Sequence, residues 1–329
     1  MTARNRLPTL SIGSLGGTIC MASTSGRAGV TPRLGAGELL AELPGLTQMA
    51  CLHSADLCLL PSASMGFADL IGTFDWAKAQ VESGACGVVL TQGTDTLEET
   101  AYWLDLLWPF AAPLVLTGAM CPAGQAGSDG PGNLLAAAQV ALSADSRGRG
   151  ALVVMNGEIH AAHRVRKTAS LALVAFESPD SGPLGCLREG RTDYRQPPVP
   201  RITLPTARQA CPRVALLEAT LGADTMLLEA LPDLGYRGLV IAGFGAGHVS
   251  AEWARVLERL ATRMPVVVAS RTGKGPTAQA TYGFDGGEID LQAKGVQMAG
   301  SLCPRKSRLL LSLLLANGMA SSFARFLPR

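Results

Sequence analysis

The run Leu10-Ser-Ile-Gly-Ser-Leu-Gly-Gly-Thr18-Ile-Cys20 begins as a β-strand and passes into a glycine-rich turn that ends on a threonine. A second hydroxyl-rich turn, Thr91-Gln-Gly-Thr94-Asp95-Thr96, follows another strand-like run. In an open parallel α/β sheet, such turns gather at the carboxyl ends of the strands, where ligands bind. We therefore predict that Thr18 and Thr94 share one ligand-binding edge, which offers hydroxyls, backbone N–H groups and one carboxylate.

Short β-rich runs alternate with amphipathic helical segments through the first two-thirds of the chain, which is typical of βαβ units. The runs are rich in Val, Ile and Leu, as a parallel sheet covered on both faces requires. The predicted strands are residues 7–14, 57–60, 87–91, 114–117 and 151–155. This alternation predicts an α/β domain with a mainly parallel sheet.

A helix is predicted over residues 97–108, because its apolar residues recur at helical spacing. Thr96 and Glu99 have the spacing of a capping box, which would define the start of this helix. Thr94 and Asp95 then lie just before a helix amino terminus. Converging N–H groups at such a terminus favour a bound carboxylate.

A chain of 329 residues exceeds the usual size of one domain, and its composition changes in a proline-rich stretch at 188–213. Proline removes backbone donors and interrupts helices there. Beyond this stretch, strands are predicted at 214–218, 239–242 and 266–269, with a helix at 251–261. We predict an amino-terminal α/β catalytic domain over 1–190, a linker over 191–212 and a smaller carboxy-terminal α/β domain over 213–329.

The formal charge of +2 creates no extended field, and basic residues are spread along the chain. We therefore expect neither nucleic acid nor a membrane as a partner. The amino terminus lacks the apolar core of a secretion signal, and the apolar run 309–316 is too short to span the ~30 Å of hydrocarbon in a bilayer. Eight cysteines without a Cys-x-x-Cys pair predict reduced, mostly buried thiols in a cytoplasmic protein.

Several well-known motifs are incomplete in this chain. The glycines at 13–17 lack the full Gly-x-Gly-x-x-Gly spacing, Gly273-Lys274-Gly275 lacks the Ser/Thr of a phosphate loop, and no Gly-x-Ser-x-Gly elbow occurs. His160-Ala-Ala-His163 with nearby Glu158 has no further ligand set at zinc spacing, so we expect no metal. A generic tight turn between a strand and a helix explains the glycines at 13–17 equally well.

A threonine-based site is the chemistry that the other residues offer. A threonine hydroxyl is a poor nucleophile until a neighbouring base takes its proton, and a lysine can be that base. Lys167, just beyond a predicted strand end, is the candidate. The alternative is a solvated basic loop formed with Arg164 and Arg166, and spacing alone favours it.

Five ordered segments resemble the signatures of the bacterial-type L-asparaginase and glutaminase-asparaginase family, a family of threonine amidohydrolases. They are Gly16-Gly-Thr18-Ile, Thr91-Gln-Gly-Thr-Asp-Thr-Leu-Glu-Glu-Thr-Ala-Tyr102, Leu116-Thr-Gly-Ala-Met120 with Asp129-Gly-Pro-x-Asn133-Leu, Glu158-Ile-His160 through Lys167-Thr, and Ala175-Phe-x-Ser-Pro-x-x-Gly-Pro-Leu-Gly185. The resemblance extends over nearly the whole chain. It implies a larger flavodoxin-like amino-terminal domain, a smaller carboxy-terminal α/β domain, homotetramers built from intimate dimers, and no cofactor.

This resemblance also implies an L-asparagine amidohydrolase that releases L-aspartate and ammonia. Thr18 would attack the side-chain amide carbon and form a β-acyl-enzyme, which water would then hydrolyse. Thr94 would activate the nucleophile or the water, and Lys167 would lower the cost of its deprotonation. Asp95 would hold the substrate ammonium, and Ser62 matches the family serine that binds the α-carboxylate.

Further substrate-binding positions follow from the same resemblance. Backbone groups at Gly17, Gly93 and Ala119 would line the site, where N–H groups are natural donors to an oxyanion. The family also lends residues to a neighbouring site across a dimer interface. In this chain His248 and Glu288 occupy the corresponding segments.

The chain also departs from the family pattern. Residues 20–40 contain no tyrosine of the kind that hydrogen-bonds the nucleophile in much of the family, and Ser23, Thr24, Ser25 or Thr31 could replace it. The other departures are Ala63, Ser64 and Gln92, where the family often has Gln, Asp and His. Two alternatives therefore stay open: a glutaminase-asparaginase or other ω-amidase of broader specificity, and a degenerate amino-acid-binding homologue.

Overall fold

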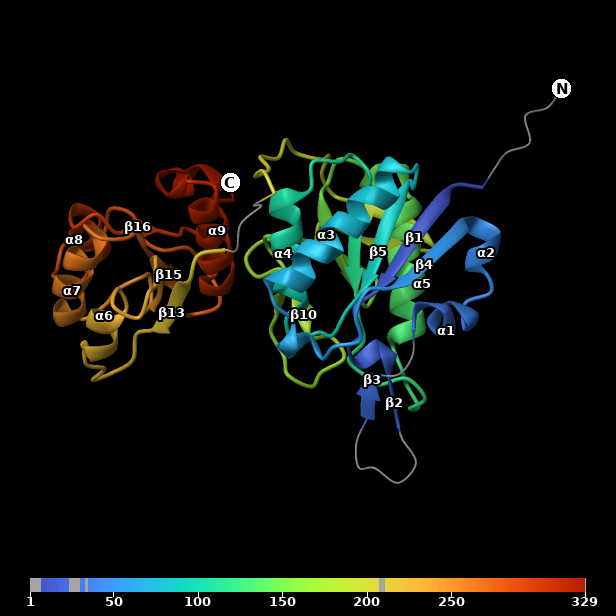
Figure 1. The fold of residues 1–329 in the computed structure, drawn as a ribbon, viewed down its shortest axis with the longest axis horizontal. Coiled ribbons are helices and arrows are strands. Elements are labelled where there is room, and N and C mark those ends of the chain that lie inside the picture. The colour runs from blue at the N-terminus through green and yellow to red at the C-terminus, as the bar shows by residue number, and fades with distance from the viewer. Residues whose placement is uncertain (1–6, 24–29, 33–34, 207–210, 329) are drawn as a thin grey trace. The chain divides into compact units, whose positions relative to one another are not determined.

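Eight strands form the main sheet of the amino-terminal unit, in the order β12-β11-β8-β7-β6-β5-β1-β4. Figure 1 labels β5, β1 and β4, the neighbouring strands at one edge of this sheet. This computed structural model describes residues 7–23, 30–32, 35–206 and 211–328. The chain divides into two compact units, Met1–Thr203 and Leu204–Arg329, each with its own sheet and helices. The predicted fold class, a larger and mainly parallel α/β domain followed by a smaller α/β domain, is confirmed.

Five parallel strands make up the half of this sheet that carries the candidate site. β1 pairs with both β4 and β5, and parallel pairing continues through β6 to β7. β5, β6 and β7 have the predicted bounds, because strands buried at every residue are unbroken apolar runs in the sequence. The bounds are β1 (Thr9–Ser14), β4 (Cys51–Asp56), β5 (Gly87–Thr91), β6 (Leu114–Thr117) and β7 (Ala151–Met155).

The prediction of a strand at residues 57–60 is wrong. The strand in this region is β4, which lies at the sheet edge and is mostly exposed, so it lacks an apolar run. The apolar residues after β4 instead support the turn after β1. Leu57 N donates to Ser14 O at 2.9 Å, and a Cβ built on Gly16 would lie 2.8 Å from Leu60 N.

The other half of the sheet is antiparallel. β8 (Glu158–Ala161) returns beside β7, and β11 (Gly185–Arg188) and β12 (Arg191–Tyr194) extend the sheet. β12 lies at the start of the proline-rich range 191–212. Two short ribbons lie outside the main sheet: β2 (Met21–Ser23) with β3 (Val30–Pro32), and β9 (Arg166–Lys167) with β10 (Phe176–Glu177).

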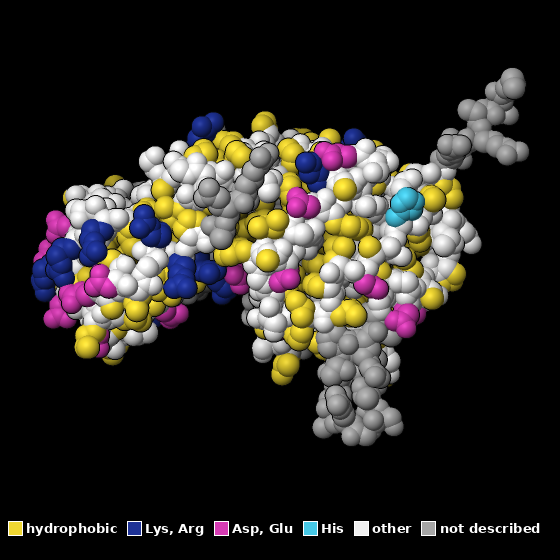
Figure 2. Space-filling view, viewed as in Figure 1, with side chains coloured by type: hydrophobic (Ala, Val, Ile, Leu, Met, Phe, Trp, Pro, Cys, Tyr) yellow, Lys and Arg dark blue, Asp and Glu magenta, His cyan; other side chains and the backbone are white. Residues whose placement is uncertain are grey.

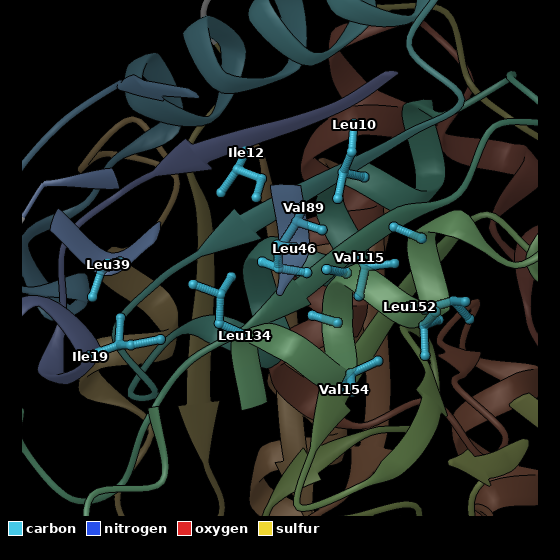
Figure 3. Close-up of a cluster of buried hydrophobic side chains, with 14 of the residues drawn as sticks. Leu10, Ile12, Ile19, Leu39, Leu46, Val89, Val115, Leu134, Leu152 and Val154 are labelled. Carbon is cyan, nitrogen blue, oxygen red and sulfur yellow. The ribbon is translucent and has the colours of Figure 1, made fainter. Parts of the chain in front are cut away.

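Helix α5 covers a core that it shares with β5, β6 and β7. Leu134 of α5 packs in this core with Val89, Val115 and Val154 from the strands (Figure 3). Helices α3 and α4 pack against each other beside the sheet. The bounds are α1 (Ala36–Ala41), α2 (Leu46–Met49), α3 (Phe67–Glu82), α4 (Leu97–Leu107) and α5 (Gly130–Leu142), with short 3-10 turns η1 (Thr18–Cys20), η2 (Ser62–Ser64) and η3 (Ala144–Ser146).

Helix α4 begins where the sequence predicts, but the predicted capping box is wrong. Thr96 occupies the N-cap position, and its side chain makes no capping hydrogen bond. Its hydroxyl instead donates to Ser62 O at 2.9 Å and accepts from Gln92 Nε2 at 3.0 Å. Tertiary partners thus replace the local cap, and they tie the start of α4 to the turn at Ser62.

The carboxy-terminal unit contains a four-stranded parallel sheet in the order β13-β14-β15-β16. Its helix α7 (Ala251–Ala261) has the predicted bounds, and the Ser250 hydroxyl caps it by accepting from Trp253 N at 3.2 Å. α9 (Pro304–Ala316) contains the apolar run 309–316 and packs on β13 and β14. The other bounds are β13 (Val214–Glu218), β14 (Gly238–Gly243), β15 (Val266–Ser270), β16 (Gln297–Met298), α6 (Met226–Ala230), α8 (Glu288–Ala293) and η4 (Ala320–Phe326).

Charges of both signs are intermingled on the surface. On the face drawn in Figure 2, Lys and Arg side chains of the carboxy-terminal unit lie among Asp and Glu side chains. Exposed ion pairs such as Arg259 with Glu229 and Arg263 with Asp233 contribute to this mixture. This face therefore presents no large field of one sign. Within the described ranges, no helix is both long and apolar enough to cross a membrane.

All eight cysteines lie among the described residues and are free thiols. The prediction that most of them are buried is wrong, because only Cys20 and Cys303 are buried, five are half-buried and Cys51 is exposed. Cys51 begins the edge strand β4, and Cys86 directly precedes β5. Strand ends and sheet edges border solvent, so a small side chain there keeps part of its exposure.

Candidate active site

The turns after β1 and β5 touch through their glycines. Gly17 has a φ of 86°, in the region that favours glycine, and a Cβ built on it would overlap the backbone of Gly93. Thr18 directly follows Gly17 and Thr94 directly follows Gly93. The structure therefore brings the two threonine turns together at the carboxyl ends of adjacent strands, as expected for a parallel sheet.

Thr18 begins η1 and is half-buried. A buried hydrogen bond between Ser14 Oγ and Cys20 Sγ, which lie 3.3 Å apart, stabilises the turn that carries Thr18. Burial raises the pKa of the Cys20 thiol. A raised pKa favours the neutral thiol at Cys20.

Lys167 hydrogen-bonds two of the other three predicted catalytic residues, Thr94 and Asp95. Its Nζ donates to Thr94 Oγ1 at 2.9 Å and to Asp95 Oδ1 at 3.1 Å. The Thr94 residue is 5% exposed and the Lys167 side chain 18%, whereas the Asp95 side chain is 65% exposed. The ammonium is thus held against a buried hydroxyl, while the carboxylate beside it stays open to a ligand.

The alternative of a solvated basic loop does not describe Lys167. Its strand β9 pairs with β10, with Phe176 opposite Lys167. The backbone N–H of Lys167 also donates to Glu98 Oε2 of α4 at 2.7 Å. These contacts turn the side chain toward Thr94 and away from solvent.

Ser62 presents a buried hydroxyl beside the Gly93 turn. It is 2% exposed, and among the described residues its Oγ has no hydrogen-bond partner. A Cβ built on Gly93 would lie 2.7 Å from Ser62 Oγ, so only glycine fits beside this buried hydroxyl. Buried hydroxyls normally have partners, which makes this one a natural group to bind a ligand oxygen.

Ala119 lies in the turn after β6, and its position is determined by Asp129. Met120 N and Cys121 N donate to the Asp129 carboxylate at 3.0 and 2.8 Å. Gly118 packs against the Thr94 turn, because a Cβ built on it would lie 3.3 Å from Thr94 Cγ2. Asp129 is a site-supporting residue that the sequence alone did not reveal, and its place directly before the helix that follows β6 is the signal that could have suggested it.

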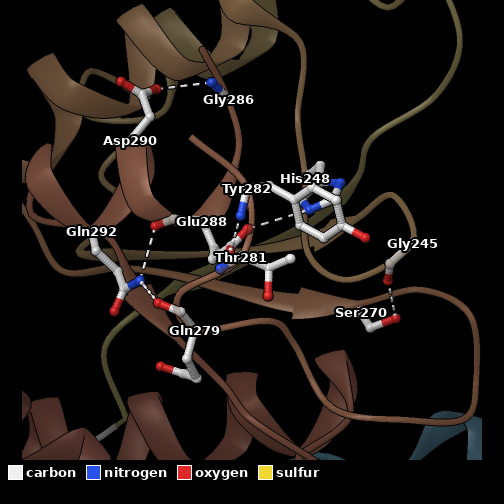
Figure 4. Close-up of polar contacts among 10 residues, drawn as sticks. All are labelled: Gly245, His248, Ser270, Gln279, Thr281, Tyr282, Gly286, Glu288, Asp290 and Gln292. Carbon is white, nitrogen blue, oxygen red and sulfur yellow. Dashed lines mark hydrogen bonds and ion pairs between the residues drawn. The ribbon is translucent and has the colours of Figure 1, made fainter. Parts of the chain in front are cut away.

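His248 and Glu288 lie together in the carboxy-terminal unit (Figure 4). Glu288 is buried, its Oε1 accepts from Tyr282 N at 2.7 Å and from Thr281 N, and its Oε2 lies 3.5 Å from His248 Nε2. Burial raises the pKa of this carboxyl, but the N–H donors and His248 outweigh burial and hold the pKa below its usual value. A lowered pKa favours the charged carboxylate form of Glu288.

The aromatic rings of Tyr282 and Phe284 lie edge-on to His248, with centroids 4.7 and 5.1 Å away. Tyr282 and Phe284 are 43% and 50% exposed, whereas the His248 side chain is 19% exposed and that of Glu288 is fully buried. The predicted residues thus fall into two groups. Thr18, Thr94, Asp95, Lys167, Ser62, Gly17, Gly93 and Ala119 belong to the amino-terminal unit, and His248 and Glu288 to the carboxy-terminal unit.

His160 is fully buried in β8 and hydrogen-bonded. Its Nδ1 lies 3.0 Å from Ser178 Oγ, and its Nε2 lies 3.4 Å from Glu158 Oε2. In the part of the chain that the structure describes, no group of three His, Cys, Asp or Glu side chains could hold a metal ion.

Of the hydroxyl residues suggested in place of the family tyrosine, Thr24 and Ser25 lie outside the described residues. Ser23 ends β2, and Thr31 lies in β3, where it pairs with Ala22. The ribbon that follows Thr18 therefore carries two of the four candidates.

Two family descriptions cover most of this chain. Residues 9–200 match the family described as "Asparaginase, N-terminal", and residues 213–325 match the "Glutaminase/Asparaginase C-terminal domain". The first match lies within the amino-terminal unit of the structure, and the second lies within the carboxy-terminal unit.

Relatives and a solved structure give the same result. A Haemophilus influenzae protein named "Probable L-asparaginase periplasmic" is 36% identical over 319 residues, covering 94% of this chain and 89% of that protein. A Deinococcus radiodurans "Probable L-asparaginase" is 38% identical over 324 residues, covering 95% and 94%. The crystal structure of a probable cytoplasmic L-asparaginase from Campylobacter jejuni matches with a TM-score of 0.85 at 28% identity, covering 96% of this chain and 99% of that chain. The chain therefore belongs to the asparaginase family.

Proposed function

We propose that this protein hydrolyses the side-chain amide of L-asparagine to L-aspartate and ammonia. The observation that carries this proposal is the Lys167 ammonium, which donates to both Thr94 Oγ1 and Asp95 Oδ1 next to the Thr18 turn. A binding site for an amino acid has no need of a lysine beside a buried threonine. A hydrolase needs one, because hydroxyl nucleophiles and water must lose a proton.

In the first step, Thr18 Oγ bonds to the amide carbon and the C–N bond breaks. The Thr18 proton leaves with the nitrogen as ammonia, so the product on the protein is a β-acyl ester. Lys167, by donating to Thr94 Oγ1, stabilises the negative charge that develops as Thr94 relays this proton. Backbone N–H groups near Thr94 and Ala119 stabilise the charge on the carbonyl oxygen.

In the second step, water attacks the acyl carbon and the ester bond to Thr18 Oγ breaks. The same Thr94 and Lys167 pair accepts a proton from the attacking water and returns one to Thr18 Oγ, which leaves as the free hydroxyl. The product leaves as the side-chain acid, whose proton passes to the released ammonia, so aspartate and ammonium are the final products. Neither step requires a cofactor.

The head group of the substrate is held at both of its charges. The unpartnered hydroxyl of Ser62 donates to the α-carboxylate, and the exposed Asp95 carboxylate accepts from the α-ammonium. Holding both charges directs the side-chain amide at Thr18, and positioning of this kind supplies a large share of a rate enhancement.

A second copy of the chain completes the site. Its buried Glu288 carboxylate and His248 face the substrate ammonium from the carboxy-terminal unit, in a homotetramer or at least a homodimer. The exposed Tyr282 and Phe284 rings over this pair suit an interface, where aromatic residues are enriched. A cytoplasmic location is supported by the eight free thiols, which are typical of a reducing compartment.

Replacement of the nucleophile tests this function. Thr18→Ala should abolish ammonia release from L-asparagine without lowering the melting temperature, because the side chain is half-buried and lies in a turn. Thr18→Ser, which keeps the hydroxyl, should retain measurable turnover. Wild-type turnover by purified Thr18→Ala would show that Thr18 is not the nucleophile.

Broader amide specificity is the second candidate. Ala63 and Ser64, beside the Ser62 hydroxyl, are short and exposed, so they leave room around the substrate head. Ammonia release from L-asparagine, L-glutamine and D-asparagine, assayed side by side, separates an asparaginase from a glutaminase-asparaginase or broader ω-amidase. Binding of these amides without ammonia release would instead identify a degenerate amino-acid-binding homologue.

A further inference from the structure

Asn133 joins three separate segments behind the candidate site. It is 4% exposed and lies in the first turn of α5. Its Nδ2 donates to Gly118 O and to Asp129 Oδ2, both at 3.0 Å, and its Oδ1 accepts from Asn156 N at 2.9 Å. Both donors and one acceptor of this amide are therefore used, which is how a buried amide holds its neighbours in a unique geometry.

The first of these segments supports Thr94. Gly118 follows β6, and a Cβ built on it would lie 2.5 Å from Gln92 O and 3.3 Å from Thr94 Cγ2. Gln92 N also donates to Thr117 O at 2.9 Å. The backbone that Asn133 holds is thus the surface on which the Thr94 turn rests.

The second segment leads to Lys167. Asn156 and Gly157 form the turn between β7 and β8, with φ values of 51° and 76°. Asn156 Nδ2 donates to Leu173 O at 2.6 Å, in the loop between β9 and β10. That loop closes where Thr168 N donates to Ala175 O at 2.8 Å, next to the pairing of Phe176 with Lys167.

We propose that Asn133 and Asn156 are positioning residues that hold the Lys167 ribbon, β9 with β10, at its hydrogen-bond distance from Thr94. Asn133 hydrogen-bonds Gly118 O, beside the Thr94 turn, and the backbone N–H of Asn156. Asn156 in turn hydrogen-bonds Leu173 O, in the loop of the ribbon that carries Lys167. The two amides connect both ends of the bond between Lys167 Nζ and Thr94 Oγ1 without touching either atom. This inference rests on the proposed function, in which that bond promotes proton transfer.

Asn156→Gly is the sharpest test. Glycine adopts the left-handed φ readily and keeps the backbone N–H that donates to Asn133 Oδ1, so the substitution removes only the side-chain hydrogen bond to Leu173 O. We expect kcat for L-asparagine to fall about 10-fold while KM stays within about 2-fold, since displacement of a catalytic group by an ångström costs up to about 100-fold in rate. The Ser62 hydroxyl and the Asp95 carboxylate lie on segments that Asn156 does not itself contact, so binding should change less than kcat.

Glu189→Gly is the matched control. Glu189 is exposed, has a φ of 49° and precedes Gly190 in the turn between β11 and β12, so its replacement adds the same backbone freedom to a similar hairpin. Its kcat and KM should equal those of the wild type, and both variants should melt at similar temperatures. Equal kcat values for the two variants, or a fall in kcat matched by an equal rise in KM, would overturn the positioning role.

Asn133→Asp adds a second measurement at the centre of the network. It keeps the shape of the side chain and the acceptor for Asn156 N, but places oxygen where Nδ2 donates to Gly118 O and Asp129 Oδ2. A folded Asn133→Asp protein should lose more kcat than Asn156→Gly, and Asn156→Gly decides the question if Asn133→Asp fails to fold. Absence of ammonia release from the wild type would refute the proposed function itself, which separates that failure from failure of this inference.

Discussion

Lys167 is the residue whose role depends most on its surroundings. In the sequence it ends a short basic run with Arg164 and Arg166, and such a run usually belongs to a solvated loop. In the structure it lies in a two-residue strand whose pairing turns the side chain toward Thr94. A strand of two residues is too short for a periodic pattern, so the sequence left both interpretations open and the ribbon decides between them.

Replacing Lys167 with methionine should remove proton transfer and leave binding. We expect Lys167→Met to lower kcat for L-asparagine by about 10³-fold, because a positioned acid or base contributes roughly 10²–10⁴ to a rate. Ammonia release measured at saturating substrate reports this loss. Arg164→Met removes a neighbouring basic charge that contacts neither threonine, and it should keep wild-type turnover. A loss of less than 10-fold in Lys167→Met would contradict the role of the ammonium.

At the scale of elements, burial decides which strands and helices the sequence reveals. β5, β6 and β7 are buried at every residue, and their bounds are those that the apolar runs predict. β4 is an exposed edge strand without an apolar run, so the sequence pattern does not reveal it. The leucines that follow it led to the wrong prediction of a strand at residues 57–60. The capping box at α4 fails for a related reason, since Thr96 finds the tertiary partner Ser62 O. Local spacing cannot report such partners.

The α5 core provides the stability prediction at this scale. Leu134→Ala should lower the free energy of unfolding by about 2–5 kcal/mol, because Leu134 is 1% exposed and its loss leaves a cavity against β5 and β6. Gly132→Ala, in the same helix, should instead raise it by about 0.5 kcal/mol, since Gly132 is exposed and a Cβ there meets no atom within 4 Å. Urea unfolding measures both, and equal stabilities would contradict this account of the core.

At the scale of the whole molecule, the predicted site residues are divided between the two units. The Thr18 and Thr94 turns with Lys167 belong to the amino-terminal unit, and Glu288 with His248 to the carboxy-terminal unit. Glu288 is a buried carboxylate that accepts two backbone N–H groups, with its second oxygen left near His248. In the proposed assembly, the Glu288 carboxylate of a second copy faces the substrate ammonium.

Complementation between two inactive variants tests the shared site. Thr18→Ala and Glu288→Gln, each expected to be inactive alone, should together recover about a quarter of wild-type turnover when coexpressed, because random pairing leaves one intact site in half of the symmetric dimers. Thr18→Ala coexpressed with Lys167→Met should recover nothing, since both changes fall in the same unit. No recovery from the first pair, with both variants soluble and associated, would refute a site built from two chains.

The sequence by itself determined the alternation of strands and helices, the ends of the four parallel strands β1, β5, β6 and β7, and the two threonine turns, because apolar runs and glycine turns are local patterns. The tertiary structure decided which side chains meet there. Lys167 reaches Thr94 across 73 positions of sequence, Ser62 keeps a buried hydroxyl beside Gly93, and Asn133 joins segments that no spacing relates. Such contacts depend on pairing between distant parts of the chain, and their geometry exists only once the sheet has formed.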